Sequence, residues 1–323
     1  MTSRQVRLNI RWLTTIAAVL ALALAGCGDD SDSPPDDGKT QQLTVAALPL
    51  ADDATLYIAQ NRGLFKKEGL DVRIRPVQQS IQALPALANG QVDVIASANY
   101  VTFLQAHEKG TLDVRILAEG ARVAPHMMDV LVPKDSPVKS VADLEGKKIA
   151  VNILNNIQSL TLNAILAEQG AGRPVYRQIA FPQMGPALEK GQVDAVHAAE
   201  PFNTAVQEQL GARVLVDGGS APVAGIPISG YVTTSAYADK NPKAAAAFQR
   251  AIAAAAKLAT EDPTAVREQL PKYTKVTADQ AKSIHLPAYP ATTDVEQLTR
   301  LTDLMRKQGL LKQAVDPATL LVK

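Results

Sequence analysis

The chain has 323 residues, of which 46% are hydrophobic and 20% charged, a composition typical of a globular protein with room for two domains. Its 33 basic and 32 acidic residues nearly balance, so charge gives no support for nucleic-acid binding, and no nucleic-acid partner is expected. Cys27 is the only cysteine, which excludes an internal disulfide.

Residues 1–26 have the parts of a secretory signal peptide. Three arginines precede an apolar run from Trp12 to Ala25 that is short for a membrane span. The segment ends Leu24-Ala25-Gly26-Cys27, which resembles a bacterial lipobox. The resemblance implies that Cys27 is lipidated and becomes the new N-terminus. An uncleaved anchor or a buried free thiol is the alternative interpretation.

The stretch 27–42 is predicted to be a flexible tether, because the segment from Gly28 to Gln42 contains no apolar residue. A lipid at Cys27 and this tether would hold the folded part at the extracytoplasmic face of the cell membrane.

Short apolar runs then predict strands, with Asp52 or Asp53, and later Ser80, as helix N-caps. Strands are expected at 43–48, 70–76, 92–96, 128–133, 148–154, 175–180, 193–197, 213–217 and 228–234, and helices include 160–169 and 241–260.

The segment 85–93 recurs at 186–194 with the same pattern. In each copy a predicted helix closes at a glycine, Gly90 or Gly191, and a short apolar strand follows. Two copies suggest two similar α/β lobes. Asn99 and Glu200 occupy equivalent positions just past these strands, where open α/β sheets bind ligands. We therefore expect both residues to face one cleft between the lobes.

Several motifs carry a family resemblance. Glu68-Gly69-Leu70-Asp71-Val72, the segment 140–151 and Glu200-Pro201-Phe202 are similar to the solute-binding proteins of ABC importers. The subclass is that of nitrate, sulfonate and taurine, whose domain is shared with pyrimidine-synthase-like proteins. The resemblance implies an α/β type II periplasmic-binding-protein fold, in which two crossover strands form a hinge. The expected lobes are 43–133 with 234–323, and 134–233.

Ligand-binding candidates lie near predicted strand ends and helix starts. The segment 155–159 is the most polar uncharged cluster, although Asn155 and Ser159 could equally cap the next helix. Glu200 could accept hydrogen bonds from a ligand or cap the helix after Pro201. If it faces the cleft, an amino-bearing or heterocyclic solute fits better than nitrate. The candidates are Asp53, Ser80, Ser97, Asn99, Tyr100, Asn155, Asn156, Ser159, Phe181, Glu200 and Tyr231.

Catalytic patterns are weak. The four histidines are scattered without zinc-helix spacing, and no nucleophile elbow or phosphate loop occurs. We expect no catalytic residue, metal or cofactor. The sequence predicts a monomeric solute-binding component that delivers a small sulfonate-, taurine- or pyrimidine-like solute to ABC permease and ATPase subunits. The alternatives are a pyrimidine-biosynthesis-type enzyme on the same fold and a ligand-sensing accessory protein.

Overall fold

The computed structural model describes residues 40–323. The predicted signal peptide and Cys27 therefore lie outside the described residues. Gln41 and Gln42, which we expected in the tether, already belong to the first strand, because Gln41 pairs with Leu70. Within 40–323, every helix is too short or too polar to cross a bilayer.

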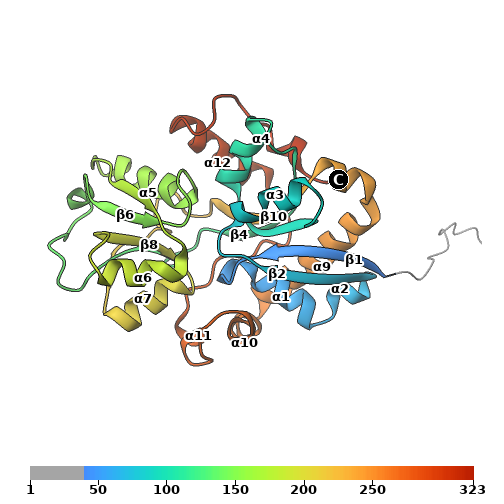
Figure 1. Cartoon of the computed structure of the whole chain (residues 1–323), viewed down its shortest axis with the longest axis horizontal. Helices are drawn as coiled ribbons and strands as arrows, with labels where there is room; N and C mark the ends of the chain where they lie inside the picture. Colours follow the sequence, from blue (N-terminus) through green and yellow to red (C-terminus); the bar gives the residue numbers. More distant parts are fainter. Residues whose placement is uncertain (1–39) are drawn as a thin grey trace, which may run out of the picture. The chain divides into compact units, whose positions relative to one another are not determined.

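Two mixed five-stranded sheets organise the described residues (Figure 1). The first sheet has the order β2-β1-β3-β10-β4 and the second the order β7-β6-β8-β5-β9. The strands are β1 (Gln41–Ala47), β2 (Leu70–Pro76), β3 (Val94–Asn99), β4 (Val114–Arg122), β5 (Met128–Val132), β6 (Lys148–Val151), β7 (Val175–Gln178), β8 (Ala195–Ala199), β9 (Arg213–Val216) and β10 (Pro227–Thr234).

After β10 the chain returns to the lobe of the first sheet and forms a long C-terminal set of helices there. Helices connect and cover the strands of both sheets. They are α1 (Ala54–Asn61), α2 (Leu64–Lys67), α3 (Leu84–Ala88), α4 (Tyr100–Glu108), α5 (Ile157–Glu168), α6 (Phe181–Glu189), α7 (Phe202–Leu210), α8 (Ser235–Lys240), α9 (Pro242–Glu261), α10 (Pro263–Tyr273), α11 (Gln280–Ser283) and α12 (Val295–Lys307), with 3-10 turns η1 (Ala51–Asp53), η2 (Ser80–Ala83), η3 (Ala142–Leu144) and η4 (Pro317–Leu320).

Strand pairing corrects the expected lobe boundaries. β5 pairs antiparallel with β8 and β9, so residues 128–132 belong to the second sheet and not the first. β10 pairs antiparallel with β3 and β4, so residues 227–233 belong to the first sheet. The crossover strands are thus β5 and β10, and each belongs to the sheet of the lobe that the chain enters. The changes of lobe lie in the loops before them, at 123–127 and 217–226.

The repeated segment has the same structure in both lobes, as the sequence predicted. Gly90 and Gly191 adopt the left-handed backbone that closes a helix, with φ of 73° and 65°. The repeated aspartate has one role in both copies. Asp93 Oδ2 accepts a hydrogen bond from Thr44 N at 2.7 Å, and Asp194 Oδ2 accepts one from Lys148 N at 2.8 Å. The aspartate therefore holds a backbone N–H of the neighbouring strand in both lobes.

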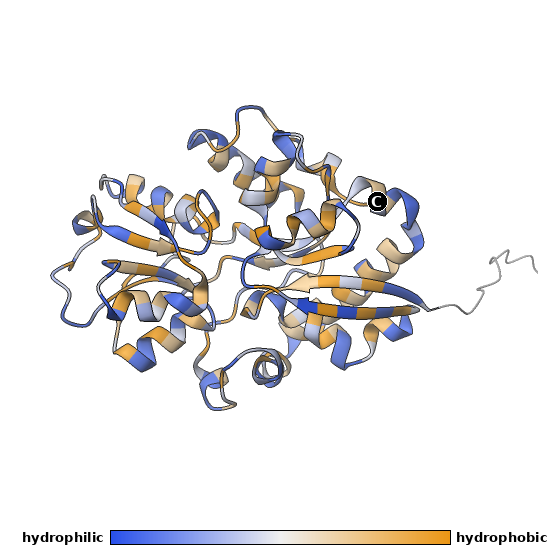
Figure 2. Cartoon of the chain, in the orientation of Figure 1, coloured by the Kyte–Doolittle hydropathy of each residue, from blue (hydrophilic) through white to orange (hydrophobic). Residues whose placement is uncertain are grey.

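The apolar core follows from the strand sequences. The central strands β3, β5 and β8 are almost wholly buried, whereas the helices carry both hydrophobic and hydrophilic residues (Figure 2). The alanine-rich α9 packs against α1, because small side chains allow close approach. Phe248 of α9 contacts Phe65 and Tyr231, with ring centroids 5.3 and 5.4 Å apart. This packing ties the C-terminal helices to the first lobe.

Candidate functional site

A small cavity lies between the two lobes at the ends of β1, β3, β6 and β8. Its volume is about 30 Å³, room for only a few water molecules, so the two lobes approach each other closely at this point. Both lobes contribute polar and apolar groups. The lining residues are Leu48, Leu50, Asp52, Ser80, Ser97, Asn99, Met127, Met128, Asn152, Asn156, Ile157, Gln158, Phe181, Ala199, Ile228 and Ser229.

Five of the predicted ligand-binding residues line this cavity: Ser80, Ser97, Asn99, Asn156 and Phe181. Asn99 comes from the first lobe, and its Oδ1 accepts hydrogen bonds from Thr102 N of α4 and from Ile157 N of the second lobe, both at 3.4 Å. Asn156 caps α5, accepting from Gln158 N and Ser159 N. Capping and cavity lining are therefore compatible in one side chain. Ser80 makes no cap hydrogen bond, so its predicted capping role is wrong.

Three other predicted residues point into the protein. Asp53 occupies the N-cap position of α1, one of the two predicted options, but its side chain makes no cap hydrogen bond and instead accepts from Leu48 N at 2.9 Å. Tyr100 donates to Ala118 O at 3.4 Å. Tyr231 shares a 2.6 Å hydrogen bond with Thr55 Oγ1. All three predicted residues are buried and lie outside the cavity lining.

Two more predicted residues stabilise the loop that follows β6. Asn155 is exposed with φ of 54°, and its carbonyl oxygen accepts from Gln105 Nε2 of α4 at 2.8 Å. Ser159 Oγ donates to Asn156 O at 3.0 Å. Neither lines the cavity, but the Gln105 contact joins the two lobes.

Glu200 is buried and also lies outside the cavity lining. Its carboxylate accepts from Thr204 N at 3.0 Å and Thr204 Oγ1 at 2.7 Å, in the first turn of α7. It also accepts from His285 N of the first lobe at 3.1 Å, while its carbonyl oxygen accepts from Ala51 N at 3.0 Å. Burial raises the pKa of Glu200 to about 7, against the opposing effect of these hydrogen bonds. Glu200 thus braces a helix and links the lobes.

The acidic group in the cavity is instead Asp52, which we considered only as a helix cap. It makes no cap hydrogen bond; its Oδ2 accepts from Ser229 Oγ at 2.8 Å. Burial raises the pKa of this carboxyl to about 6, although the Ser229 bond opposes the shift. Gln158 also lines the cavity and belongs to the polar segment 155–159 indicated by the sequence, whereas the lining residues Asn152 and Ser229 are outside our prediction. Only their place beside strand ends could have indicated them.

Direct hydrogen bonds hold the cavity shut. Gln79 Nε2 of the first lobe donates to Asn152 O of the second, and Asn152 Nδ2 donates back to Gln78 O at 3.4 Å. Together with the contacts of Asn99, Gln105 and Glu200, these bonds span the cleft from one edge to the other. A solute of several atoms can enter the cavity between the lobes only if some of these hydrogen bonds break.

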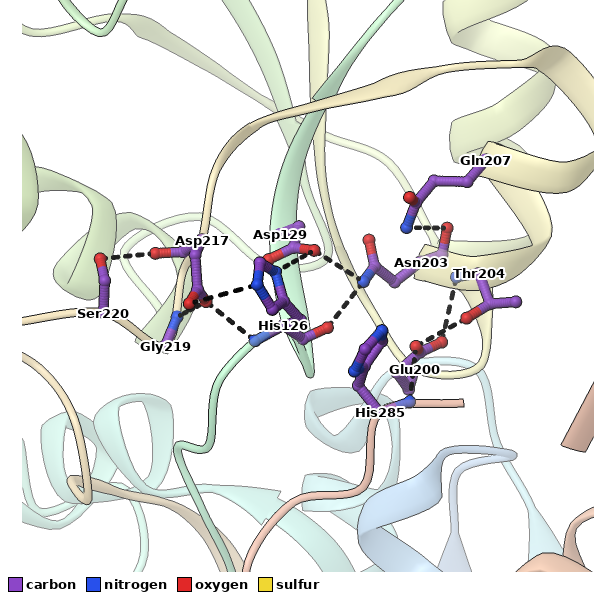
Figure 3. Close-up of polar contacts among 10 residues, drawn as sticks. All are labelled: His126, Asp129, Glu200, Asn203, Thr204, Gln207, Asp217, Gly219, Ser220 and His285. Atoms are coloured by element: carbon purple, nitrogen blue, oxygen red, sulfur yellow. Dashed lines mark hydrogen bonds and ion pairs between the residues drawn. The ribbon is translucent and has the colours of Figure 1, made fainter. Parts of the chain in front are cut away.

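A second polar cluster lies beside the two changes of lobe (Figure 3). His126 Nδ1 is 3.3 Å from Asp129 Oδ2, and His126 Nε2 is 3.9 Å from Asp217 Oδ2. One donor atom from each residue can be chosen so that all lie within 4.8 Å of one another, a set that could hold a cation. Asn203 Nδ2 donates to Asp129 Oδ2 at 3.2 Å. The sequence did not indicate this set, because Asp217 is remote in the chain.

Comparison with known proteins identifies the family. Residues 51–266 match the family model described as "NMT1/THI5 like". The chain belongs to the NMT1/THI5-like family. It is 30% identical over 192 residues to a candidate aliphatic-sulfonate-binding protein of Escherichia coli (strain K12), covering 58% of this chain and 57% of that protein. It is 31% identical over 151 residues to a candidate thiamine-biosynthesis protein of Haemophilus influenzae, covering 46% of each. The chain thus spans about half the length of these curated relatives.

Solved structures confirm the predicted two-lobed periplasmic-binding-protein fold. The alkanesulfonate-binding protein SsuA from Xanthomonas axonopodis pv. citri, bound to MOPS, has a TM-score of 0.74 at 21% identity, covering 88% of this chain and 98% of that one. The desulfurization enzyme DSZB has a TM-score of 0.65 at 17% identity, covering 87% and 96%. The fold is therefore shared by binding proteins and an enzyme, and the site must decide between them.

Proposed function

We propose that this chain is the extracytoplasmic solute-binding component of an ABC importer. The observation that supports this function best is the cavity between the lobes, lined by polar side chains from both. Family membership and the similarity to sulfonate-binding proteins support the same function. The solute is a small sulfonate-, taurine- or pyrimidine-like compound, and the protein acts as a monomer.

Transport begins with hinge closure. A solute that contacts both lobes stabilises the closed state, and the permease and ATPase subunits respond to that state. The loops 123–127 and 217–226 supply the two connections around which the lobes can rotate. The hydrogen bonds of Gln79 and Asn99 across the cleft form only when the lobes approach. Closure therefore adds protein contacts to those made by the solute.

An enzyme on the same fold is the second candidate, since DSZB shares it. Nucleophilic catalysis would need a side-chain nucleophile with a base to activate it. The cavity offers Ser229 hydrogen-bonded to Asp52, but its lining has no histidine, cysteine or lysine. This set suits binding better than group transfer. Mass spectrometry of candidate solutes incubated with the protein tests the choice, and any turnover would contradict a binding function.

A thermal-shift screen of sulfonates, amino acids, pyrimidines, amines and oxyanions tests the proposed function. A solute that binds only the folded state stabilises it by about 2.7 kcal/mol at a hundred times its Kd. For a chain of this size, that corresponds to a rise in Tm of roughly 5 °C. Native mass spectrometry after exposure to a cell extract is the companion measurement. If both methods find no bound small molecule, the proposal is wrong.

The lipid anchor belongs to the same proposal. Lipidated Cys27 would tether the protein at the outer face of the membrane, and the Cys27→Ser variant should move it from the membrane fraction to the soluble fraction. A variant that stays with the membrane would contradict the anchor but leave solute binding intact.

A further inference from the structure

The cavity between the lobes contains a carboxylate with one oxygen that has no hydrogen-bond partner. Asp52 is only 4% exposed, and while its Oδ2 is hydrogen-bonded to Ser229, its Oδ1 is buried without a hydrogen-bond partner. Ser97, which also lines the cavity, has a buried hydroxyl that makes no direct hydrogen bond, although it lies near enough to Asp53 to lower the pKa of that carboxyl. Buried polar atoms are usually satisfied, so these two indicate where a ligand would make its contacts.

No cation balances this carboxylate among residues 40–323. Asp52 takes part in no salt bridge there, and the cavity lining contains neither lysine nor arginine. The titratable groups that face it from neighbouring elements are Asp53 and three tyrosines, none of which is positively charged: Tyr231, Tyr273 and Tyr289. An unpaired buried charge costs several kcal/mol, and a bound cation would remove that cost.

A larger apolar cavity adjoins the first. It has a volume of about 630 Å³, within the usual range for small-molecule sites. Phe181 lines both cavities and stacks on Phe202, with ring centroids 5.6 Å apart. Pro49, Pro201 and other apolar or uncharged side chains make up most of the wall, and Lys275 is its one charged residue. A molecule that extends past Phe181 would therefore contact the mainly apolar wall of the larger cavity.

We propose that the cleft selects an organic cation, an amine or amidine whose charged head binds Asp52 and whose apolar body extends past Phe181 into the larger cavity. This inference rests on the proposed function and narrows its solute class. A protonated amine donates the hydrogen bond that Asp52 Oδ1 lacks and supplies the missing charge. A sulfonate or nitrate group would instead place negative charge against a buried carboxylate.

Calorimetric titration of matched probe pairs tests the inference. Hexylamine is compared with hexanesulfonate, and benzamidine with benzenesulfonate, so each pair shares its apolar body and differs in the sign of its head group. At pH 7.5 the cation of each pair should bind at least about tenfold more tightly. Asp52→Asn should weaken cation binding by about 10- to 100-fold and leave sulfonate binding equal or stronger. The exposed Glu189→Gln variant, which also loses one negative charge, should bind like the wild type.

The pH profile gives a second readout. Burial raises the pKa of Asp52 to about 6, so the carboxylate becomes protonated at lower pH while benzamidine stays charged. Wild-type affinity for benzamidine should therefore fall about tenfold between pH 7.5 and 5, and the Asp52→Asn variant should show no such fall. The variant isolates Asp52 from Asp53, which remains in both proteins.

The outcomes separate this inference from the proposed function. If the sulfonates bind and the cations do not, the inference is overturned and the proposed function stands. If the cations bind equally well to Asp52→Asn, their head group lies elsewhere and the inference also fails. If no probe binds, and the solute screen and native mass spectrometry also find nothing, both fail together.

Discussion

Glu200 illustrates how one side chain can couple helix capping, contact between lobes and titration. It is fully buried, and its carboxylate accepts hydrogen bonds from Thr204 in the second lobe and His285 in the first. Burial outweighs these bonds and raises its pKa from the ordinary 4.5 to about 7. The folded state therefore holds the proton more tightly than the unfolded state does, and the neutral form is the one that favours folding.

The free energy of unfolding should reflect this shift. The stabilising contribution of neutral Glu200 is fully present below pH 4.5 and is lost as the pH rises through about 7, a change of roughly 3 kcal/mol. Glu200→Gln cannot ionise, so its stability should fall less between pH 5 and 8. Urea unfolding of both proteins at pH 5, 6, 7 and 8 measures the difference. Asp52 and Asp129, whose pKa values burial also raises, remain in both. Parallel stability curves would contradict the prediction.

At the scale of elements, β10 depends on a glycine. Gly230 lies between β3 and β4, opposite Ala98 and Glu119. A Cβ atom there would lie 1.9 Å from Tyr100 Oη and 2.6 Å from Ala118 O. The crossover strand can fill the gap in the first sheet only because this position has no side chain. The requirement comes from the side chain of Tyr100 of α4 and the backbone of β4, and not from an unusual backbone angle.

Gly230→Ala should therefore destabilise the fold, by about 1–3 kcal/mol or more, because the new methyl group must push apart Tyr100 and the adjacent strand. Gly185→Ala in α6 is the matched control. Its Cβ would approach Val206 Cγ2 at 3.4 Å, an ordinary contact, and alanine favours the helix by up to about 1 kcal/mol. Thermal or urea unfolding distinguishes the two. Equal stability of the two variants would show that the sheet relaxes around residue 230.

At the scale of the whole folded region, hydrogen bonds across the cleft favour the closed arrangement. Gln79 is buried, and its side chain reaches from the first lobe to Asn152 O in the second. Asn99 and Gln105 make comparable contacts to the start of α5 and the loop before it. Each such bond contributes about 0.5–1.5 kcal/mol to closure. The more these hydrogen bonds contribute together, the less of the ligand's binding energy is needed to close the lobes.

Gln79→Ala should shift the ligand-free protein toward the open arrangement, by up to about tenfold in the equilibrium constant. Small-angle X-ray scattering would detect this as a larger radius of gyration, and the exposed Gln192→Ala variant should match the wild type. If all three proteins scatter alike in the absence of ligand and close alike with it, the Gln79 bond does not control closure.

Local sequence patterns determined most of the secondary structure. Gly90 and Gly191 ended their helices where predicted, and the alternating apolar and charged segment 70–76 forms β2 with the expected bounds. These features depend on propensity and on periodicity within a few residues. The internal repeat likewise indicated two similar lobes, because like segments bury like faces. Asn99 was correctly expected at the cleft, since strand ends meet there.

Tertiary structure decided which acid faces the cavity. Asp52 and Asp53 are adjacent in the chain, yet one side chain lines the cavity and the other accepts a hydrogen bond from Leu48 N. Glu200, the acid expected there, turns instead to Thr204 and His285. Successive residues of the 3-10 turn η1 are rotated by about 120°, which sends the two side chains in different directions. Three features depend on how distant segments pack, which no local pattern records. They are the direction of the Asp52 side chain, the lobe to which β5 belongs, and the contact of His126 with Asp217.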